Sequence, residues 1–244
     1  MVTNLLRLKA RESEVQAFRH QVSESAAKRH LPAKLAAEIL KGSMTFDLEA
    51  QKYTATVLLA EVCDFAAATD ALAPKAIATV LNEFLLAATE IVFDQEGLVD
   101  KCVGEGVVAL FGVAGTQDPK AQAERAAATG AALLHRIEEL NEQWSRQNLP
   151  RLALRIGVHL GPVVFSHFGG TRRSDFSAVG PTVHLTSRIL AQASPGEILM
   201  SASVAQHLAQ ESQESLGLFA LAEPGGEKIS LSRLRVGTRS HQAA

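Results

Sequence analysis

The sequence predicts a mixed α/β fold of the α+β type, in which helices cover one face of a mainly antiparallel sheet. Three observations predict it. Residues 54–62 form a nearly continuous apolar run with β-branched side chains, as in a buried central strand. Helical periodicity of apolar residues follows over 74–92, beginning with a proline. Two short apolar runs within 98–111 flank a Gly-Glu-Gly tip and predict a hairpin.

The next elements repeat the pattern of helix and strand. A proline at 119 begins an alanine-rich helix that we expect to end near 144. Residues 152–160 are the next strand, and a Gly-Pro pair predicts a turn at 161–162. The order is therefore β-α-β-β-α-β, which is the ferredoxin-like plan.

The chain continues beyond this core with shorter elements. We expect a polar, glycine-rich loop at 169–175, a helix at 182–192 and a short strand after the Pro-Gly pair at 195–196. Residues 216–235 read as a closing hairpin.

Three segments follow from this division. Residues 1–43 are expected to be an N-terminal helical extension, 44–237 the α/β domain, and 238–244 a disordered tail. Within the extension, 4–29 carries a weak heptad spacing that suggests a helix for dimerisation or linkage. A helix packed on its own domain fits the same spacing equally well.

Composition excludes several classes of partner. The chain has 244 residues, of which 47% are hydrophobic and 20% charged, and its net charge is -2. This charge balance does not favour binding to nucleic acid or to an anionic lipid surface. No apolar stretch is long enough to predict direct membrane insertion. The two cysteines lack the spacing of a zinc or redox site, so we expect a cytoplasmic protein.

Two carboxylates stand at strand ends that the predicted sheet makes neighbours. Glu61 ends the first strand and Glu105 is at the hairpin tip. Paired carboxylates at one sheet edge suit divalent cations that bridge the phosphates of a nucleotide. Solvated strand-end residues remain the alternative.

Five sequence blocks carry a resemblance to a known family. They are TVLLAEVCDF, LVDKCVGEGVVALFG, LRIGVHLGPVV, FSAVGPTVHLTSR and PGEILMS. In order and spacing they resemble the class III nucleotide cyclases, that is, the adenylyl and guanylyl cyclases, over about residues 30–205. The resemblance implies a head-to-tail homodimer with its active sites at the interface. One protomer of such a dimer supplies the metal ligands, and the other reads the purine and stabilises the transition state.

The resemblance assigns the metal positions to Glu61 and Glu105, where the family has aspartates that hold Mg²⁺ or Mn²⁺. The reaction it implies is attack of the ribose 3′-hydroxyl on the α-phosphate with release of pyrophosphate. Glutamate keeps the charge but moves the oxygens out by roughly 1 Å, and such a shift can cost about 100-fold in rate. Manganese or calcium would tolerate the change better than magnesium.

The resemblance assigns the remaining site residues to the strands and helix that follow. Lys101 matches the lysine that accompanies adenine selection, and Ser177 falls where adenine-selective members carry Asp or Thr. Arg188 matches the arginine that stabilises the transition state. His184 replaces an asparagine that positions the ribose, and Pro181 beside it replaces a polar residue.

Three interpretations of function follow. The first is a degenerate cyclase domain in cyclic-nucleotide signalling, which acts through binding of ATP or GTP, dimerisation or contact with a protein signalling partner. The second is an active adenylyl cyclase with unusual glutamate ligands. The third, a palm-type enzyme such as a diguanylate cyclase, is disfavoured because the hairpin lacks that family's acidic-aromatic tip.

Overall fold

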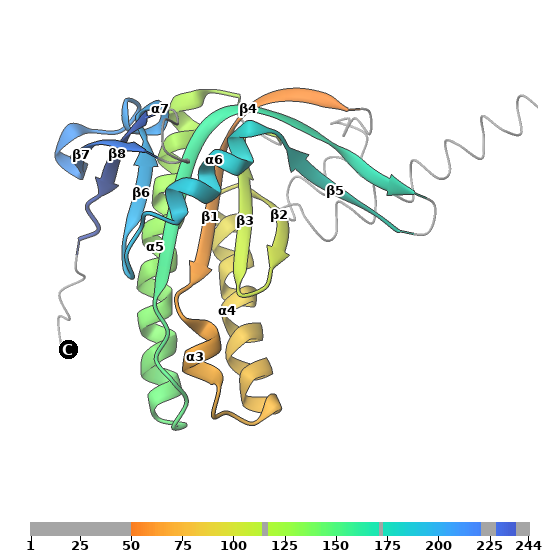
Figure 1. Cartoon of the computed structure of the whole chain (residues 1–244), viewed down its shortest axis with the longest axis vertical. Coiled ribbons are helices and arrows are strands. Elements are labelled where there is room, and N and C mark those ends of the chain that lie inside the picture. Colours follow the sequence, from red (N-terminus) through yellow and green to blue (C-terminus); the bar gives the residue numbers. More distant parts are fainter. Residues whose placement is uncertain (1–49, 114–116, 171–172, 221–227, 238–244) are drawn as a thin grey trace, which may run out of the picture.

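The computed structural model of the chain describes residues 50–113, 117–170, 173–220 and 228–237 (Figure 1). The predictions for the N-terminal extension and for the tail lie outside these residues. In chain order the elements are β1 (Gln51–Val62), α3 (Phe65–Thr69), α4 (Pro74–Asp94), β2 (Leu98–Val103), β3 (Gly106–Phe111), α5 (Pro119–Ser145), β4 (Leu154–Gly170), β5 (Arg173–Val179), α6 (Pro181–Leu190), β6 (Ile198–Ser201), α7 (Ala202–Ala205), the 3₁₀ helix η1 (Gln210–Ser212), β7 (Gln213–Ala220) and β8 (Lys228–Leu234).

All the described strands belong to one sheet, in the order β2-β3-β1-β4-β6-β8-β7, with β5 paired to β4 outside this path. The pairs are antiparallel except β4 with β6, which is parallel. The first four strands, in the order β2-β3-β1-β4, together with α4 and α5 make the β-α-β-β-α-β core. The predicted fold class is therefore confirmed.

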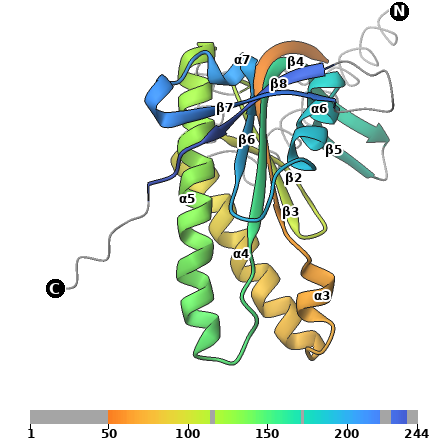
Figure 2. The same ribbon diagram turned by 60° about the vertical axis from the view of Figure 1, so that its left-hand side comes forward.

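The two long helices of the core lie side by side on one face of the sheet (Figures 1 and 2). Alternate residues of β1, such as Leu58 and Ala60, pack against buried side chains of α4 and α5 such as Phe84 and Leu133. By length and composition α4 would also suit a membrane span, the one such helix among the described residues. Its buried apolar side chains, such as Val80 and Phe84, however, form part of this core.

Helix α6, which follows the core, crosses the opposite face of the sheet over β4 (Figure 1). Gly157 of β4 permits this contact, because a Cβ there would stand 2.6 Å from the backbone nitrogen of Leu190 and 2.8 Å from the carbonyl oxygen of Thr186. Glycine thus lets the helix backbone rest directly on the strand.

Two predicted irregularities are in fact strand. The turn expected at 161–162 is wrong, because β4 continues through it and Pro162 pairs with Thr54 of β1. The loop expected at 169–175 is wrong at 169–170 and 173–175, where Gly169 and Gly170 pair with the first residues of β5, and its residues 171–172 lie outside the described ones. The outer parts of β4 and β5 form a hairpin arm that projects from the sheet (Figure 1).

Candidate functional site

The predicted site residues of β1 and β2 share the face of the sheet opposite α4 and α5. Leu59 and Lys101 both pair with Val108 of β3, and Glu61 pairs with Gly106 two residues along. Side chains that oppose one another in a sheet, or lie two residues apart, point to the same face. This face is the one that α6 and the arm partly cover.

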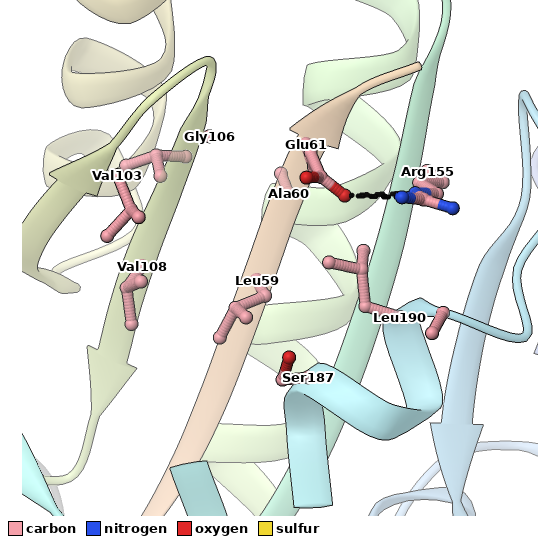
Figure 3. A pocket seen from close by; sticks show the side chains of 11 residues that line it. Leu59, Ala60, Glu61, Val103, Gly106, Val108, Arg155, Ser187 and Leu190 are labelled. Carbon is pink, nitrogen blue, oxygen red and sulfur yellow. Dashed lines mark hydrogen bonds and ion pairs between the residues drawn. The ribbon is translucent and has the colours of Figure 1, made fainter. Parts of the chain in front are cut away.

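Glu61 does not stand alone at the end of β1, because Arg155 of β4 lies directly opposite it. The Nε and one Nη of the Arg155 guanidinium donate to the same carboxylate oxygen of Glu61, at 3.0 and 2.8 Å (Figure 3). Each side chain is about one-third exposed, at 33% for Glu61 and 35% for Arg155. The carboxylate is therefore already neutralised by a neighbouring cation.

This ion pair lies at the edge of a pocket of about 310 Å³ between the sheet and α6 (Figure 3). The remaining walls are mostly apolar and come from β1, β2, β3 and α6. They are Leu59, Ala60, Val103, Gly106, Val107, Val108, Ser187, Leu190 and Ala191.

Glu105 lies beside the end of β1, as predicted, although the contact is made by its backbone. Its carbonyl oxygen accepts a hydrogen bond from the amide of Val62 at 3.2 Å. The turn before it needs glycine, since Gly104 has φ of 56°. The Glu105 side chain is half-buried.

The described arrangement holds Glu61 in an ion pair and so does not present two free carboxylates to a divalent cation. One of the two expected carboxylates is held by a guanidinium, so the pair of carboxylates with Arg155 carries a net charge of about -1. Among residues 50–113, 117–170, 173–220 and 228–237, no cluster of three or more His, Cys, Asp and Glu side chains could hold a metal. A cation would have to compete with Arg155 for Glu61.

The structure joins Lys101 and Ser177, which the resemblance assigned to the purine. The Lys101 ammonium donates to the Ser177 hydroxyl at 2.7 Å, although the two residues belong to β2 and to the arm. Asp100 holds them from inside, with one carboxylate oxygen 3.2 Å from the ammonium and 3.3 Å from the hydroxyl. Burial raises the pKa of Asp100, while Lys101 and the amide of Ala178 oppose this shift.

Arg188 and His184 lie one turn apart on α6, and both side chains are exposed. Neither makes a hydrogen bond or ion pair with a described residue in the Glu61 or Lys101 groups. The predicted site residues therefore form three groups: the carboxylate positions, the Lys101–Ser177 pair, and the polar face of α6.

Sequence reasoning missed two residues, Arg155 and Asp100. Each is a charged residue inside a strand that otherwise reads as apolar, in LALRIGVHL and in LVDKCV. That interruption was the available signal. Its meaning depends on strand register, which places Arg155 against Glu61 and Asp100 against the arm.

Comparison with known proteins agrees with the fold and with the motifs. The chain is 29% identical to an adenylate cyclase of Anabaena cylindrica over 172 residues, which are 67% of this chain and 32% of the relative. It thus spans about a third of that relative's length.

Two solved structures are similar over most of the described fold. The adenylyl cyclase CyaB from P. aeruginosa superposes with a TM-score of 0.73 at 27% identity, covering 79% of this chain and 98% of that structure. The guanylyl cyclase Cya2 superposes with a TM-score of 0.69 at 25% identity, covering 79% and 97%. The model of the adenylate and guanylate cyclase catalytic domain matches residues 48–223. The chain therefore belongs to the class III adenylyl and guanylyl cyclase family.

Proposed function

We propose that this domain acts in cyclic-nucleotide signalling mainly by binding a purine nucleoside triphosphate and by dimerising, with weak or no cyclase activity. The observation that carries the proposal is a contrast within one face of the sheet. The Lys101–Ser177 pair is assembled at 2.7 Å, whereas Glu61 at the metal position is bound to Arg155 at 2.8 Å.

The residues of this chain would have separate roles in such a site. Lys101 and Ser177 offer polar groups to the edge of a base, and the exposed guanidinium of Arg188 offers a charge to phosphate oxygens. A metal ion, when bound, would supply charge neutralisation and activation of the ribose hydroxyl. Glu61 and Glu105 would be its ligands only after Arg155 releases Glu61.

A homodimer is part of the proposal, because the residues assigned to one site form separate groups in a single chain. Exposed apolar side chains lie close to these groups in sequence. They include Val103 next to the hairpin tip, at 60% exposed, and Val164, Phe168 and Val179 on the arm. Apolar surface of this kind suits contact with a second copy of the chain or with a protein signalling partner.

A second candidate, an active adenylyl cyclase, is favoured by the groups that remain in place. Both positions that the resemblance assigns to metal keep a negative charge, and Lys101 and Arg188 match the family pattern in sequence. Manganese, which is less demanding than magnesium, would be the better cofactor for such an enzyme.

Two measurements on the purified full chain test the proposal. Titration calorimetry with ATP and with GTP should show binding, and an assay of cyclic AMP and cyclic GMP with Mg²⁺ or Mn²⁺ should show little product. Sedimentation should show a dimer that Val103→Asp and deletion of the first 30 residues each weaken. Rapid product formation by the unmodified chain would favour the second candidate, and absence of nucleotide binding would refute the first.

A further inference from the structure

A bulge in β2 gives Asp100 an unusual position. Val99 pairs with Ala109 and Lys101 with Val108, so the ladder to β3 steps over Asp100 and leaves it without a partner there. Bulges re-aim a side chain from its regular direction. The Asp100 side chain is fully buried, with 0% exposed, and reaches across to β5.

Its two carboxylate oxygens are held by different groups. One oxygen accepts a hydrogen bond from the amide of Ala178 at 2.7 Å. The other lies 3.2 Å from the Lys101 ammonium and 3.3 Å from the Ser177 hydroxyl. Because Ala178 and Ser177 belong to the arm, Asp100 ties the arm to β2 next to Lys101.

These contacts fix the direction of the Ser177 hydroxyl. A serine hydroxyl has one proton and two lone pairs, and an ammonium can only donate. Lys101 therefore uses one lone pair of Ser177. The proton has two acceptors, the Asp100 carboxylate and the carbonyl oxygen of Ala178, each at 3.3 Å. Both acceptors are the protein's own, and the charged one forms the stronger bond.

One hydrogen-bond acceptor and one donor then remain for a ligand. Ser177 keeps a lone pair and can only accept, while Lys101 keeps one of its three N–H groups and can only donate. An adenine edge carries an amino donor at C6 beside a ring-nitrogen acceptor, which matches this pair. Guanine carries an acceptor at C6 beside a ring N–H, so in the same pose donor faces donor and acceptor faces acceptor.

We propose that Asp100 is a positioning residue that selects 6-aminopurine over 6-oxopurine nucleotides by holding Ser177 as an acceptor. The inference rests on the proposed nucleotide binding. Asp100 does not touch the base; it acts through the hydroxyl and the ammonium that do.

The substitution Asp100→Asn tests this with little change of shape. The asparagine oxygen can keep the bond from Ala178, but its amide N–H₂ then faces Ser177 and must donate. Ser177 would then accept from both Asn and Lys101, while its proton keeps the Ala178 carbonyl oxygen, so no lone pair remains for the amino group of adenine. The ratio of ATP to GTP affinity should fall by about tenfold or more, since a mismatched polar group at a base edge costs on that order.

The ratio is read by displacement of a fluorescent mant-ATP probe with ATP, GTP and ITP, using the full chain. Asp118→Asn, at the exposed cap of α5, is the matched control and should leave the ratio unchanged. In a Ser177→Ala background, Asp100→Asn should have no further effect on the ratio, because the hydroxyl through which it acts is gone.

The possible outcomes distinguish failure of the role of Asp100 from failure of the proposed nucleotide binding. An unchanged ratio in a folded Asp100→Asn variant, or an effect that persists without the Ser177 hydroxyl, overturns the role of Asp100 while nucleotide binding stands. If Asp100→Asn does not fold, the unmodified chain decides: equal affinity for ATP and ITP overturns the inference. If the unmodified chain binds neither mant-ATP nor any other nucleotide, both the role of Asp100 and the proposed nucleotide binding are overturned.

Discussion

Arg155 holds Glu61 through two N–H donors on one carboxylate oxygen, at 3.0 and 2.8 Å. The two residues face each other across the β1–β4 ladder, so the pair is set by register rather than by a flexible surface encounter. Each side chain is about one-third exposed, which limits what the pair adds to folding stability. Its larger consequence is local, because it places a positive charge beside the carboxylate that the sequence resemblance assigns to a metal ion.

Removing that charge should strengthen cation binding. We expect Arg155→Met, which keeps most of the side-chain length, to tighten Mn²⁺ binding by about tenfold or more. Even at the dielectric constant of water, two unit charges about 4 Å apart interact by about 1 kcal/mol, and Mn²⁺ carries two charges. Titration calorimetry with Mn²⁺ measures it without reference to activity. Arg151→Met is the matched control, since it removes a guanidinium that pairs with Glu138 at a more exposed position. Equal Mn²⁺ affinity in the Arg155 variant and the parent would contradict competition for Glu61.

The fold was largely predictable because its signals are local. Apolar runs and helical periodicity identify β1, α4 and α5, and their order implies the core. The Gly-Glu-Gly hairpin was equally clear. These elements also place Glu61 and Glu105 beside each other before any coordinates are known.

The sequence did not reveal which residues of distant segments pair with one another in the sheet. Gly161 and Pro162 look like a turn, yet they continue β4 because the strand is held by β1 along one side. Residues 169–170 and 173–175 look like parts of a loop, yet their backbones pair across the arm without needing apolar side chains. The roles of Arg155 and Asp100 are hidden for the same reason, since each depends on what lies opposite.

The contact between α6 and β4 should be intolerant of any side chain. We expect Gly157→Ala to lower the free energy of unfolding by about 3 kcal/mol, because a Cβ 2.6 Å from the Leu190 backbone nitrogen forces the helix away. Urea denaturation measures the change. Gly237→Ala is the control, because its Cβ meets no described atom within 4 Å. A loss of equal size in both variants would contradict the packing argument.

His159 should make stability depend on pH. Burial lowers its pKa from 6.5 to about 4, and the ring is held neutral against the Ser201 hydroxyl at 2.7 Å. The unfolded chain binds a proton below its ordinary pKa while the fold resists it, so stability present above 6.5 is lost as pH falls toward 4.

The histidine's share can be isolated by substitution. Between pH of about 7.5 and about 5, the free energy of unfolding should fall by about 1 kcal/mol more in the parent than in His159→Gln, a figure that allows for the partial exposure of His159. Denaturation at the two pH values measures it, and His135→Gln controls for loss of a histidine elsewhere. An identical pH dependence in the parent and His159→Gln would refute the assignment.

Restoring the family's residues at three positions should raise cyclase activity. Glu61→Asp and Glu105→Asp shorten the metal ligands by one methylene, and the first also draws the carboxylate back from Arg155, which now holds it at 2.8 Å. His184→Asn replaces an exposed imidazole on α6 with a neutral planar amide. Since a misplacement of about 1 Å can cost about 100-fold in rate, the triple variant should gain about 100-fold or more.

The three groups should act as a unit, so single reversions are expected to do little while the combination does much. Lys101 and Arg188 stay unchanged because they already match the family pattern. Cyclic nucleotide formation from ATP and from GTP, with Mg²⁺ and with Mn²⁺, is the measurement, after circular dichroism and sedimentation show that the variant folds and dimerises. Adding Arg155→Met to the triple variant tests whether the ion pair is a separate obstacle. No gain in any condition would place the defect elsewhere, with Pro181 at the start of α6 the next position to change.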